Sequence, residues 1–246
     1  TFVNGTLTIT AVPLTVTAEA KTKVYGAPLP VFTASYVGFV NGDTPASLAT
    51  PVSFATTASA SSSVGTYPIT PGGAVSPNYI FSYVGSTLTV TPALLTITAD
   101  NKVKVFLGVV PTLTASYAGL VNGDTPANLD TPVTLTTTAE QTSPVGNYPI
   151  TASGAADLNY VITLVNGTLM VIELPPQLVI LGINAAGDVS LQITCQPGLT
   201  LDLEESPDLS VWTQLTRLEV TTGATTYVDV GGGNGPKKFY RLKVVP

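Results

Sequence analysis

An internal duplication constrains the fold of this chain more than any other feature of its sequence. Leu14 aligns with Leu95, and the same register of 81 positions continues without a gap through residues 14–93 and 95–174, with about half of the aligned residues identical. The shared blocks include Val-Asn-Gly-Asp-Thr-Pro-Ala, which starts at Val40 in one copy and at Val121 in the other. Such a chain is expected to contain two tandem copies of one folding module.

Each copy has the residue pattern of an antiparallel β module. Apolar and hydroxyl side chains alternate with a period of two in the blocks that begin at Leu14 and Thr87, which predicts strands with one buried face. Helix is expected only after Thr44, which can cap one or two turns that begin at Pro45. Further strands are predicted between clusters of Gly, Pro, Asn and Ser, at residues 31–36, 52–57 and 66–70.

The ends of the copies indicate how they connect. Asn166-Gly167 lies between two β runs, and this predicts that the module closes on a hairpin or a bulged strand. Only Pro92 and Ala93 separate the first copy from Leu94, where the second begins, so the linker is too short and stiff for free tumbling. We therefore expect neighbouring modules to stack end to end as a semi-rigid rod.

After Leu174-Pro-Pro the repeat stops, but strand-like segments continue. So many short strands in about 70 residues favour an immunoglobulin- or fibronectin-like sandwich, with Trp212, Phe239 and Tyr240 as core aromatics. Cys195 is interpreted as a small hydrophobic core residue of the same region. The strands are predicted at residues 177–183, 189–195, 200–204, 212–220, 225–230 and 238–244.

The predicted fold class is all-β and mainly antiparallel. It comprises a terminal strand at residues 1–12, two modules at 13–93 and 94–174, and an immunoglobulin- or fibronectin type III-like β-sandwich at 175–246, arranged end to end. The residues leave the topology of the two modules open, with a sandwich-like arrangement as one alternative.

The composition excludes several functional classes. The chain has no histidine and a single cysteine, which excludes a Ser-His-Asp triad, a zinc site of the Cys/His type and an internal disulfide. A net charge of -6 offers no cationic surface for nucleic acid, and no apolar run is long enough for membrane insertion. Glu204 and Glu205 alternate across a strand, so they cannot flank one glycosidic bond. We therefore predict a protein that is not an enzyme, with no catalytic residues, no metal site and no cofactor.

The repeated blocks resemble a known family. Lys-Val-Tyr25-Gly26, Ala-Ser-Tyr36, Phe-Val-Asn-Gly-Asp43 and Asn78-Tyr79 are together similar to the MBG repeats of large bacterial surface proteins, although the second copy has Phe106-Leu107 in place of the Tyr-Gly pair. The resemblance implies a small β module, β-grasp-like as the alternative to sandwich-like, that is arrayed in secreted or surface-anchored adhesin-like proteins and brings no catalytic residues. The last region looks, more loosely, like a C-terminal β-sandwich of bacterial extracellular proteins.

The two Asn-Gly-Asp loops supply one set of candidate site residues. They place Asn41, Asp43, Asn122 and Asp124 at the surface, where oxygen ligands occur twice. Each loop contributes one carboxylate, whereas calcium takes six to eight oxygens, so a turn followed by a helix cap is favoured over a calcium site.

The first residues supply the other candidate site. Residues 1–11 align, in the same register, with the closing strand of each copy, and are interpreted as the last strand of an absent module. Either the sequence belongs to a longer array, or this strand completes a sheet in another subunit. The contact surface would then comprise Phe2, Val3, Leu7 and Ile9.

Tandem modules, short linkers and the lack of catalytic equipment together predict a structural and adhesive protein. It is expected to be extracellular or at the cell surface, as a stalk or filament subunit. Its expected partners are further copies of itself, in a homopolymer, or other surface proteins and glycans, and not nucleic acid. The alternative is a carbohydrate- or protein-binding accessory region of a larger secreted protein.

Overall fold

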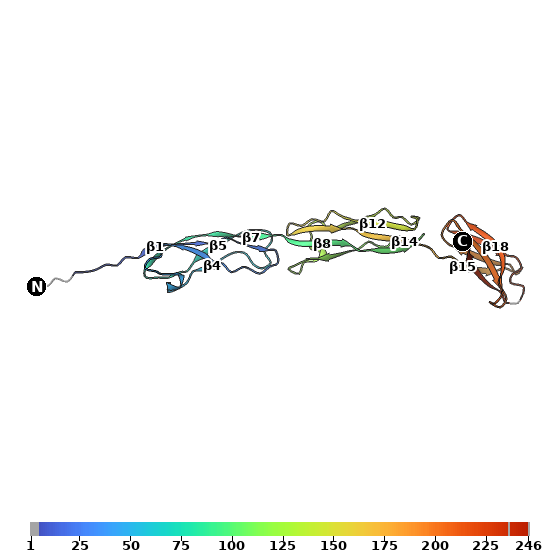
Figure 1. The fold of residues 1–246 in the computed structure, drawn as a ribbon, viewed down its shortest axis with the longest axis horizontal. Coiled ribbons are helices and arrows are strands. Elements are labelled where there is room, and N and C mark those ends of the chain that lie inside the picture. Colours follow the sequence, from blue (N-terminus) through green and yellow to red (C-terminus); the bar gives the residue numbers. More distant parts are fainter. Residues whose placement is uncertain (1–4, 236, 246) are drawn as a thin grey trace. The chain divides into compact units, whose positions relative to one another are not determined.

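The structure is a computed structural model, which describes residues 5–235 and 237–245. Regular structure in these residues is almost entirely β-strand, as Figure 1 shows. The helices among them are two single 3-10 turns, η1 (Pro45–Ser47) and η2 (Pro126–Asn128), each preceded by the predicted threonine cap. The predicted all-β fold is thus confirmed.

The first repeat forms two sheets. Its strands are β1 (Val12–Ala18), β2 (Lys21–Val24), β3 (Ala34–Val37), β4 (Ser53–Ala55), β5 (Gly65–Gly72), β6 (Tyr79–Val84) and β7 (Ser86–Thr91). One sheet has the order β3-β1-β6 and the other the order β2-β7-β5-β4. Two long segments, β1 with β2 and β6 with β7, therefore pass from one sheet into the other.

These two segments run parallel to each other, whereas the remaining strands of the first repeat pair antiparallel. β1 pairs in parallel with β6, and β2 pairs in parallel with β7. The other pairings, β1 with β3, β5 with β7 and β4 with β5, are antiparallel. Two sheets without an α-helix in the described part of the repeat correspond to the sandwich-like alternative, because a β-grasp module packs its sheet against a helix.

The second repeat has the same arrangement. Its strands are β8 (Ala93–Ala99), β9 (Lys102–Val105), β10 (Ala115–Ala118), β11 (Thr134–Thr137), β12 (Gly146–Ser153), β13 (Tyr160–Val165) and β14 (Gly167–Ile172). They form sheets of order β10-β8-β13 and β11-β12-β14-β9, which match those of the first repeat strand for strand.

Of the two closures predicted at Asn166-Gly167, a hairpin or a bulged strand, the hairpin is wrong. β13 and β14 belong to different sheets, so the chain changes sheet at this point instead of folding back. Neither residue has the positive φ of a hairpin turn. Glycine is needed for a different reason: a Cβ at Gly167 would collide with the carbonyl oxygen of Ala99 on the neighbouring segment.

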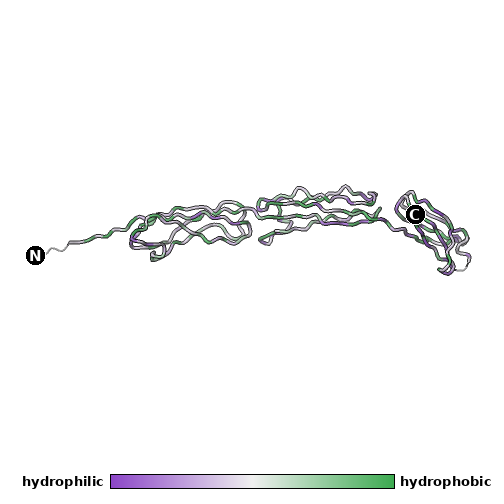
Figure 2. The backbone as a smooth tube through the Cα atoms, in the orientation of Figure 1, coloured by the Kyte–Doolittle hydropathy of each residue, from purple (hydrophilic) through white to green (hydrophobic). Residues whose placement is uncertain are grey.

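The period-two pattern of the strands builds the cores of the repeats. Alternate side chains of β1, β5 and β7 point inward, and Leu14, Val16, Ile69 and Leu88 have no exposed surface. Figure 2 shows the same alternation of apolar and polar residues along the tube. Burial of one face of each strand drives this part of the fold.

Contacts divide the described residues into two units. The first contains the residues as far as Thr98 together with Ala115–Thr134 and Ala152–Val165, and the second contains Ala99–Thr114, Leu135–Thr151 and the residues from Asn166 onward. Most of the sheet β10-β8-β13 thus belongs to the first unit, and most of the sheet β11-β12-β14-β9 belongs to the second. Contacts between the first repeat and the sheet β10-β8-β13 lie inside the first unit. The sequence-based domain limits remain predictions.

The region after residue 174 has six strands among its described residues, close to the predicted positions. They form two antiparallel sheets, β15-β16-β19 and β18-β17-β20. Cys195 is fully buried in the core between leucine and isoleucine side chains, as predicted, and Tyr240 packs against that core. Trp212 does not join it, but lies half-buried with the Arg241 guanidinium carbon 4.1 Å from its ring centroid. The strands are β15 (Gln177–Ile183), β16 (Val189–Thr194), β17 (Leu199–Ser206), β18 (Thr213–Val220), β19 (Ala224–Asp229) and β20 (Phe239–Val244).

Candidate functional site

The Tyr25-Gly26 pair lies at the end of the first repeat, directly after β2. The Tyr25 amide donates to the carbonyl oxygen of Thr91 at 2.8 Å, which extends the pairing of β2 with β7 by one residue. Gly26 has a φ of +79°, and the Ala27 amide closes a tight turn onto Val24 at 3.0 Å. This turn is held at the edge of its own repeat, next to the start of the second.

The Tyr25 ring contacts the second repeat through a shared carboxylate. Its hydroxyl donates to Oδ2 of Asp124 at 3.0 Å, and the hydroxyl of Tyr160 donates to the same oxygen at 2.6 Å. The two rings meet edge to face, with centroids 5.5 Å apart. Because the acceptor is ionised, these hydrogen bonds are stronger than bonds between neutral groups. One aspartate of the second repeat therefore fixes tyrosines from both repeats.

Backbone groups complete the joint. The Val121 amide donates to the Tyr160 hydroxyl at 3.1 Å, and the Val64 amide donates across the joint to Oδ1 of Asn159 at 2.9 Å. A Cβ at Gly26 would lie 2.6 Å from Cγ2 of Val121, closer than carbon atoms approach without a shift. Glycine thus serves twice at this position, since it tolerates the positive φ and admits the Val121 side chain.

An apolar layer surrounds these polar contacts. Tyr25 and Val90 of the first repeat share one buried cluster with Ile97, Leu129 and Tyr160 of the second, and each of these five side chains is at most 8% exposed. Burial of such side chains contributes roughly 1.5–3 kcal/mol each relative to exposure. The two repeats are therefore joined by a continuous hydrophobic core in addition to hydrogen bonds.

The electrostatics of the joint keep its phenols protonated. Burial, reinforced by the hydrogen bond to Asp124, raises the pKa of Tyr160 to about 12. For Tyr25 the hydrogen bond with Asn122 lowers the pKa, but burial and the Asp124 carboxylate outweigh it, so that its pKa is also raised. Neutral phenols on a carboxylate form a stable structural contact.

The predicted loop residues take part in turns. Asn41 and Asn122 have positive φ values of 53° and 57°, and each following Asp amide donates back to a valine carbonyl oxygen, at 3.0 Å for Asp43 and 2.9 Å for Asp124. This agrees with the turn-and-cap interpretation. What the sequence did not indicate is that both carboxylates accept from buried tyrosines, Asp43 from Tyr79 at 2.7 Å. Among the described residues, no group of three or more Cys, Asp or Glu side chains is placed to hold a metal ion.

The predicted subunit-contact strand is described only in part. Phe2 and Val3 lie outside the described residues. Leu7 and Ile9 are each 86% exposed, and the segment around them is not assigned to a strand.

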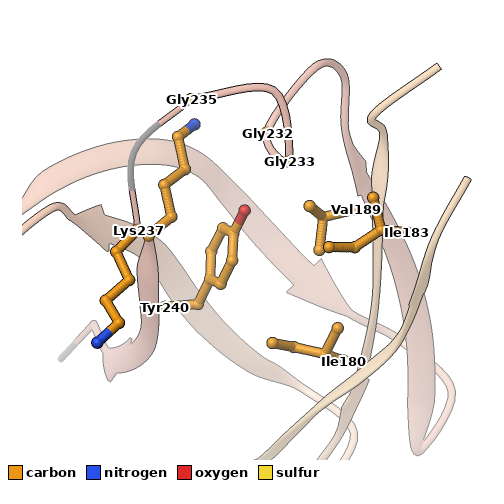
Figure 3. Close-up of a pocket in the computed structure, with 9 residues that line it drawn as sticks. Ile180, Ile183, Val189, Gly232, Gly233, Gly235, Lys237 and Tyr240 are labelled. Atoms are coloured by element: carbon orange, nitrogen blue, oxygen red, sulfur yellow. The ribbon is translucent and has the colours of Figure 1, made fainter. Parts of the chain in front are cut away.

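The region after residue 174 contains a small hollow of about 190 Å³, shown in Figure 3. The ring of Tyr240 faces Ile180, Ile183 and Val189 there. Two of its polar groups are already paired, because the Tyr240 hydroxyl donates to Asp229 at 2.8 Å and Lys238 forms an ion pair with the same carboxylate at 3.2 Å.

Several residues of the joint escaped the sequence analysis as functional residues, among them Val64, Asn159 and Tyr160. Asn-Tyr does recur as Asn78-Tyr79, which was a usable signal. The contacts of Asn159 with Val64 and of the Tyr160 ring with Tyr25, however, join different copies, so the repeat alone does not reveal them.

The departure of the second copy from the Tyr-Gly pair has a physical explanation. Phe106 is as buried as Tyr25, and Leu107 keeps the positive φ, at 62°. The sequence after this repeat contains no Asn-Gly-Asp loop. Instead the Leu107 side chain lies against Gly223, where a Cβ would collide with it. A phenol at residue 106 would thus have no Asn-Gly-Asp loop in the following sequence to supply the carboxylate that Tyr25 has.

Comparison with known proteins identifies the repeats independently. A family model described as MBG domain (YGX type) matches residues 14–89 and 95–170, which is more than half of the chain. The pair Tyr25-Gly26 with the following Ala27 fits the letters YGX. No curated protein matches the chain. No helix within the described residues is long and apolar enough to cross a membrane.

Proposed function

Because the chain belongs to the MBG domain family of the YGX type through both of its repeats, we propose that it is an extracellular structural and adhesive protein that acts as a stalk or filament subunit. Domains of this family are structural, adhesin-type repeats of surface proteins and are not a known enzyme family. In this function the repeats act as spacers, and the joints between them must resist bending and extension.

The joint at Tyr25 carries this proposal. A flexible string of independent modules needs no shared core, whereas here a buried apolar cluster, the hydrogen bond from Tyr25 to Asp124 and the hydrogen bond from the Val64 amide to Asn159 link consecutive repeats. Such a joint transmits load between neighbouring repeats and limits their relative motion, which is the requirement for a stalk or filament.

A substitution at Tyr25 tests the proposal. Tyr25→Phe removes one charge-assisted hydrogen bond and keeps the ring. We therefore expect the free energy needed to open the joint to fall by about 1.5–3 kcal/mol. Tyr148→Phe is the matched control, because Tyr148 is the equivalent of Tyr67 in the second repeat and its hydroxyl donates to a carbonyl oxygen inside its own repeat, at Pro144.

The measurement is the force at which single full-length chains extend between their ends. Tyr25→Phe should lower the force of the first extension event and leave the later, intramodular events unchanged. Tyr148→Phe should leave that first event unchanged. An identical first event in the wild-type and Tyr25→Phe chains would contradict a joint that carries force between the repeats.

Self-association through the N-terminal segment is a narrower proposal, supported by the exposure of Leu7 and Ile9. Exposed alternating apolar residues favour addition to a sheet of another molecule. Deletion of residues 1–11 should abolish polymers in sedimentation velocity and leave the far-ultraviolet circular dichroism of the repeats unchanged. Polymers that persist after the deletion would exclude this assembly mode.

A further inference from the structure

The end of the first repeat that faces away from Tyr25 carries a second copy of the acceptor site. The Tyr79 hydroxyl donates to Asp43 at 2.7 Å, and the Val40 amide donates to the Tyr79 hydroxyl at 3.2 Å. The equivalent distances at the joint are 2.6 Å for Tyr160 to Asp124 and 3.1 Å for Val121 to Tyr160. The acceptor geometry is therefore formed at both places.

Only one of these two acceptor sites is filled within the described residues. Val121 is covered by Gly26, but its equivalent Val40 is 39% exposed. Asn159 accepts from the Val64 amide, whereas its equivalent Asn78 is exposed. A hollow of about 370 Å³ lies at the unfilled site, lined by Val40, Asp43, Tyr79 and residues 9–12.

The segment next to this hollow has the sequence of the closing strand of a repeat. In the 81-residue register, Leu7 and Ile9 correspond to Leu88 and Val90 of β7. Leu88 and Val90 are 0% and 1% exposed because β7 lies between β2 and β5, whereas Leu7 and Ile9 are each 86% exposed. The segment therefore lacks, among the described residues, the two neighbouring strands that cover its counterpart.

We propose that Val40, Asp43, Asn78 and Tyr79, together with residues 6–11, form a docking site for the Tyr-Gly end of another MBG repeat. The incoming repeat places its β2 and β5 on either side of residues 6–11. Its Tyr-Gly turn enters the hollow, where the tyrosine hydroxyl donates to Asp43 and the glycine packs on Val40. The occupant is defined by the filled site on the second repeat, where Tyr25-Gly26 makes these contacts.

This proposal deepens the proposed structural function by specifying the partner, and it rests on the joint described above. It also limits what can bind. The turn of the second repeat, Phe106-Leu107, lacks both the hydroxyl and the glycine. Tyr25-Gly26 of the same chain is already bound to the second repeat. The site therefore selects a repeat that has a free Tyr-Gly end.

The test uses the full chain with an added copy of the first repeat as the probe. Residues 12–84 are placed directly before residues 4–246, so that the register of 81 positions is kept and residues 5–11 follow the added copy as its closing strand. A second fusion carries Tyr25→Phe and Gly26→Leu in the added copy only. The second repeat folds with that pair, which makes this fusion a matched control for folding.

Native hydrogen exchange is measured at residues 6–11 and at the amide of residue 64 in the added copy, which should donate to Asn78. We expect residues 6–11 to be protected in both fusions. Exchange at residue 64 of the added copy should be at least about tenfold slower in the Tyr-Gly fusion than in the Phe-Leu fusion. Equal exchange at residue 64 in the two fusions, or unprotected residues 6–11 in the Tyr-Gly fusion, would overturn the proposal.

The native joint in the same molecules separates this result from the proposed function. The amide of the original Val64 donates to Asn159 and reports on that joint. Protection at the original Val64 without protection in the added copy refutes only the docking site. Loss of protection at both would refute the rigid joint on which the proposed function depends.

Discussion

Gly26→Ala should perturb the joint through two effects that can be measured separately: backbone strain and steric overlap with Val121. The substitution forces a side chain into a φ of +79° and also places a Cβ 2.6 Å from Cγ2 and 2.7 Å from Cβ of Val121. Gly42 has nearly the same φ, at +77°, but nothing lies within 4 Å of its Cβ position. Gly42→Ala therefore measures the backbone strain alone, in the same repeat.

The magnitudes follow from these geometries. An L-residue in the left-handed region costs roughly 1–2 kcal/mol, and this applies to both substitutions. Only Gly26→Ala adds the overpacking against Val121, for which roughly 1–3 kcal/mol is typical. We therefore expect Gly26→Ala to destabilise the joint by about 2–5 kcal/mol, and Gly42→Ala to destabilise its own loop by about 1–2 kcal/mol.

Native-state hydrogen exchange of the full chain shows at which amides each substitution lowers the local stability. Gly26→Ala should lower the opening free energy at the amides of Val64 and Val121, which donate to groups of the second repeat. Gly42→Ala should leave the Val64 amide unchanged. If both substitutions lowered protection at Val64 equally, or neither did, the close approach of Gly26 to Val121 would not be what holds the joint.

Three further predictions concern buried polar groups. The pKa of Tyr160 is raised to about 12, so the stability that its protonated phenol contributes is fully present below about pH 10 and is lost as the pH rises towards 12. The free energy of unfolding should therefore fall by up to about 2–3 kcal/mol between these pH values. Tyr160→Phe should make this fall smaller. Lys23 is 5% exposed and donates to the carbonyl oxygens of residues 27 and 60. Lys23→Met should therefore lower the free energy of unfolding, measured in urea, by about 1–3 kcal/mol. Lys21→Met is the control and should lower it by at most about 1 kcal/mol, because the ion pair of Lys21 is at the surface. Phe106→Tyr should lower the melting temperature, because it adds a hydroxyl at a buried position without an aspartate partner; an unchanged melting temperature would contradict this explanation of the Phe-Leu pair.

The strands were predictable because their signal is local. Alternation of apolar and polar residues located β1 and β7 and, after residue 174, strands such as β16 and β20 to within a residue or two. The turn at Thr44-Pro45 was predictable for the same reason, since cap and proline are adjacent in the sequence. The change of sheet at Asn166-Gly167 was not, because the steric requirement comes from Ala99, which is distant in sequence.

Only part of the joint could be predicted from the sequence. The acceptor residues recur in both copies, so their importance could be inferred, and Asp43 and Asp124 were selected for their carboxylates. Their partners could not be assigned, because the residue pattern of a repeat indicates which of its side chains are buried inside it. The pattern does not indicate which side chains contact the neighbouring repeat. Tyr25-Gly26 occurs once, and without the contact to Asp124 its absence from the second copy looks like random divergence.

The joint explains why the residues at the end of a repeat should depend on the next module along the chain. A buried tyrosine needs an acceptor for its hydroxyl, and an unsatisfied one costs about 1–3 kcal/mol, so Tyr-Gly is stable only before a repeat that offers an aspartate. The first repeat precedes Asp124 and has Tyr25, whereas the second precedes a region without an Asn-Gly-Asp loop and has Phe106. The acceptor loop occurs in both repeats, and its copy at Asp43 has the same geometry towards Tyr79. The Tyr-Gly pair and the Asn-Gly-Asp loop thus act as two halves of one contact, and each half specifies the neighbour that a repeat can accept.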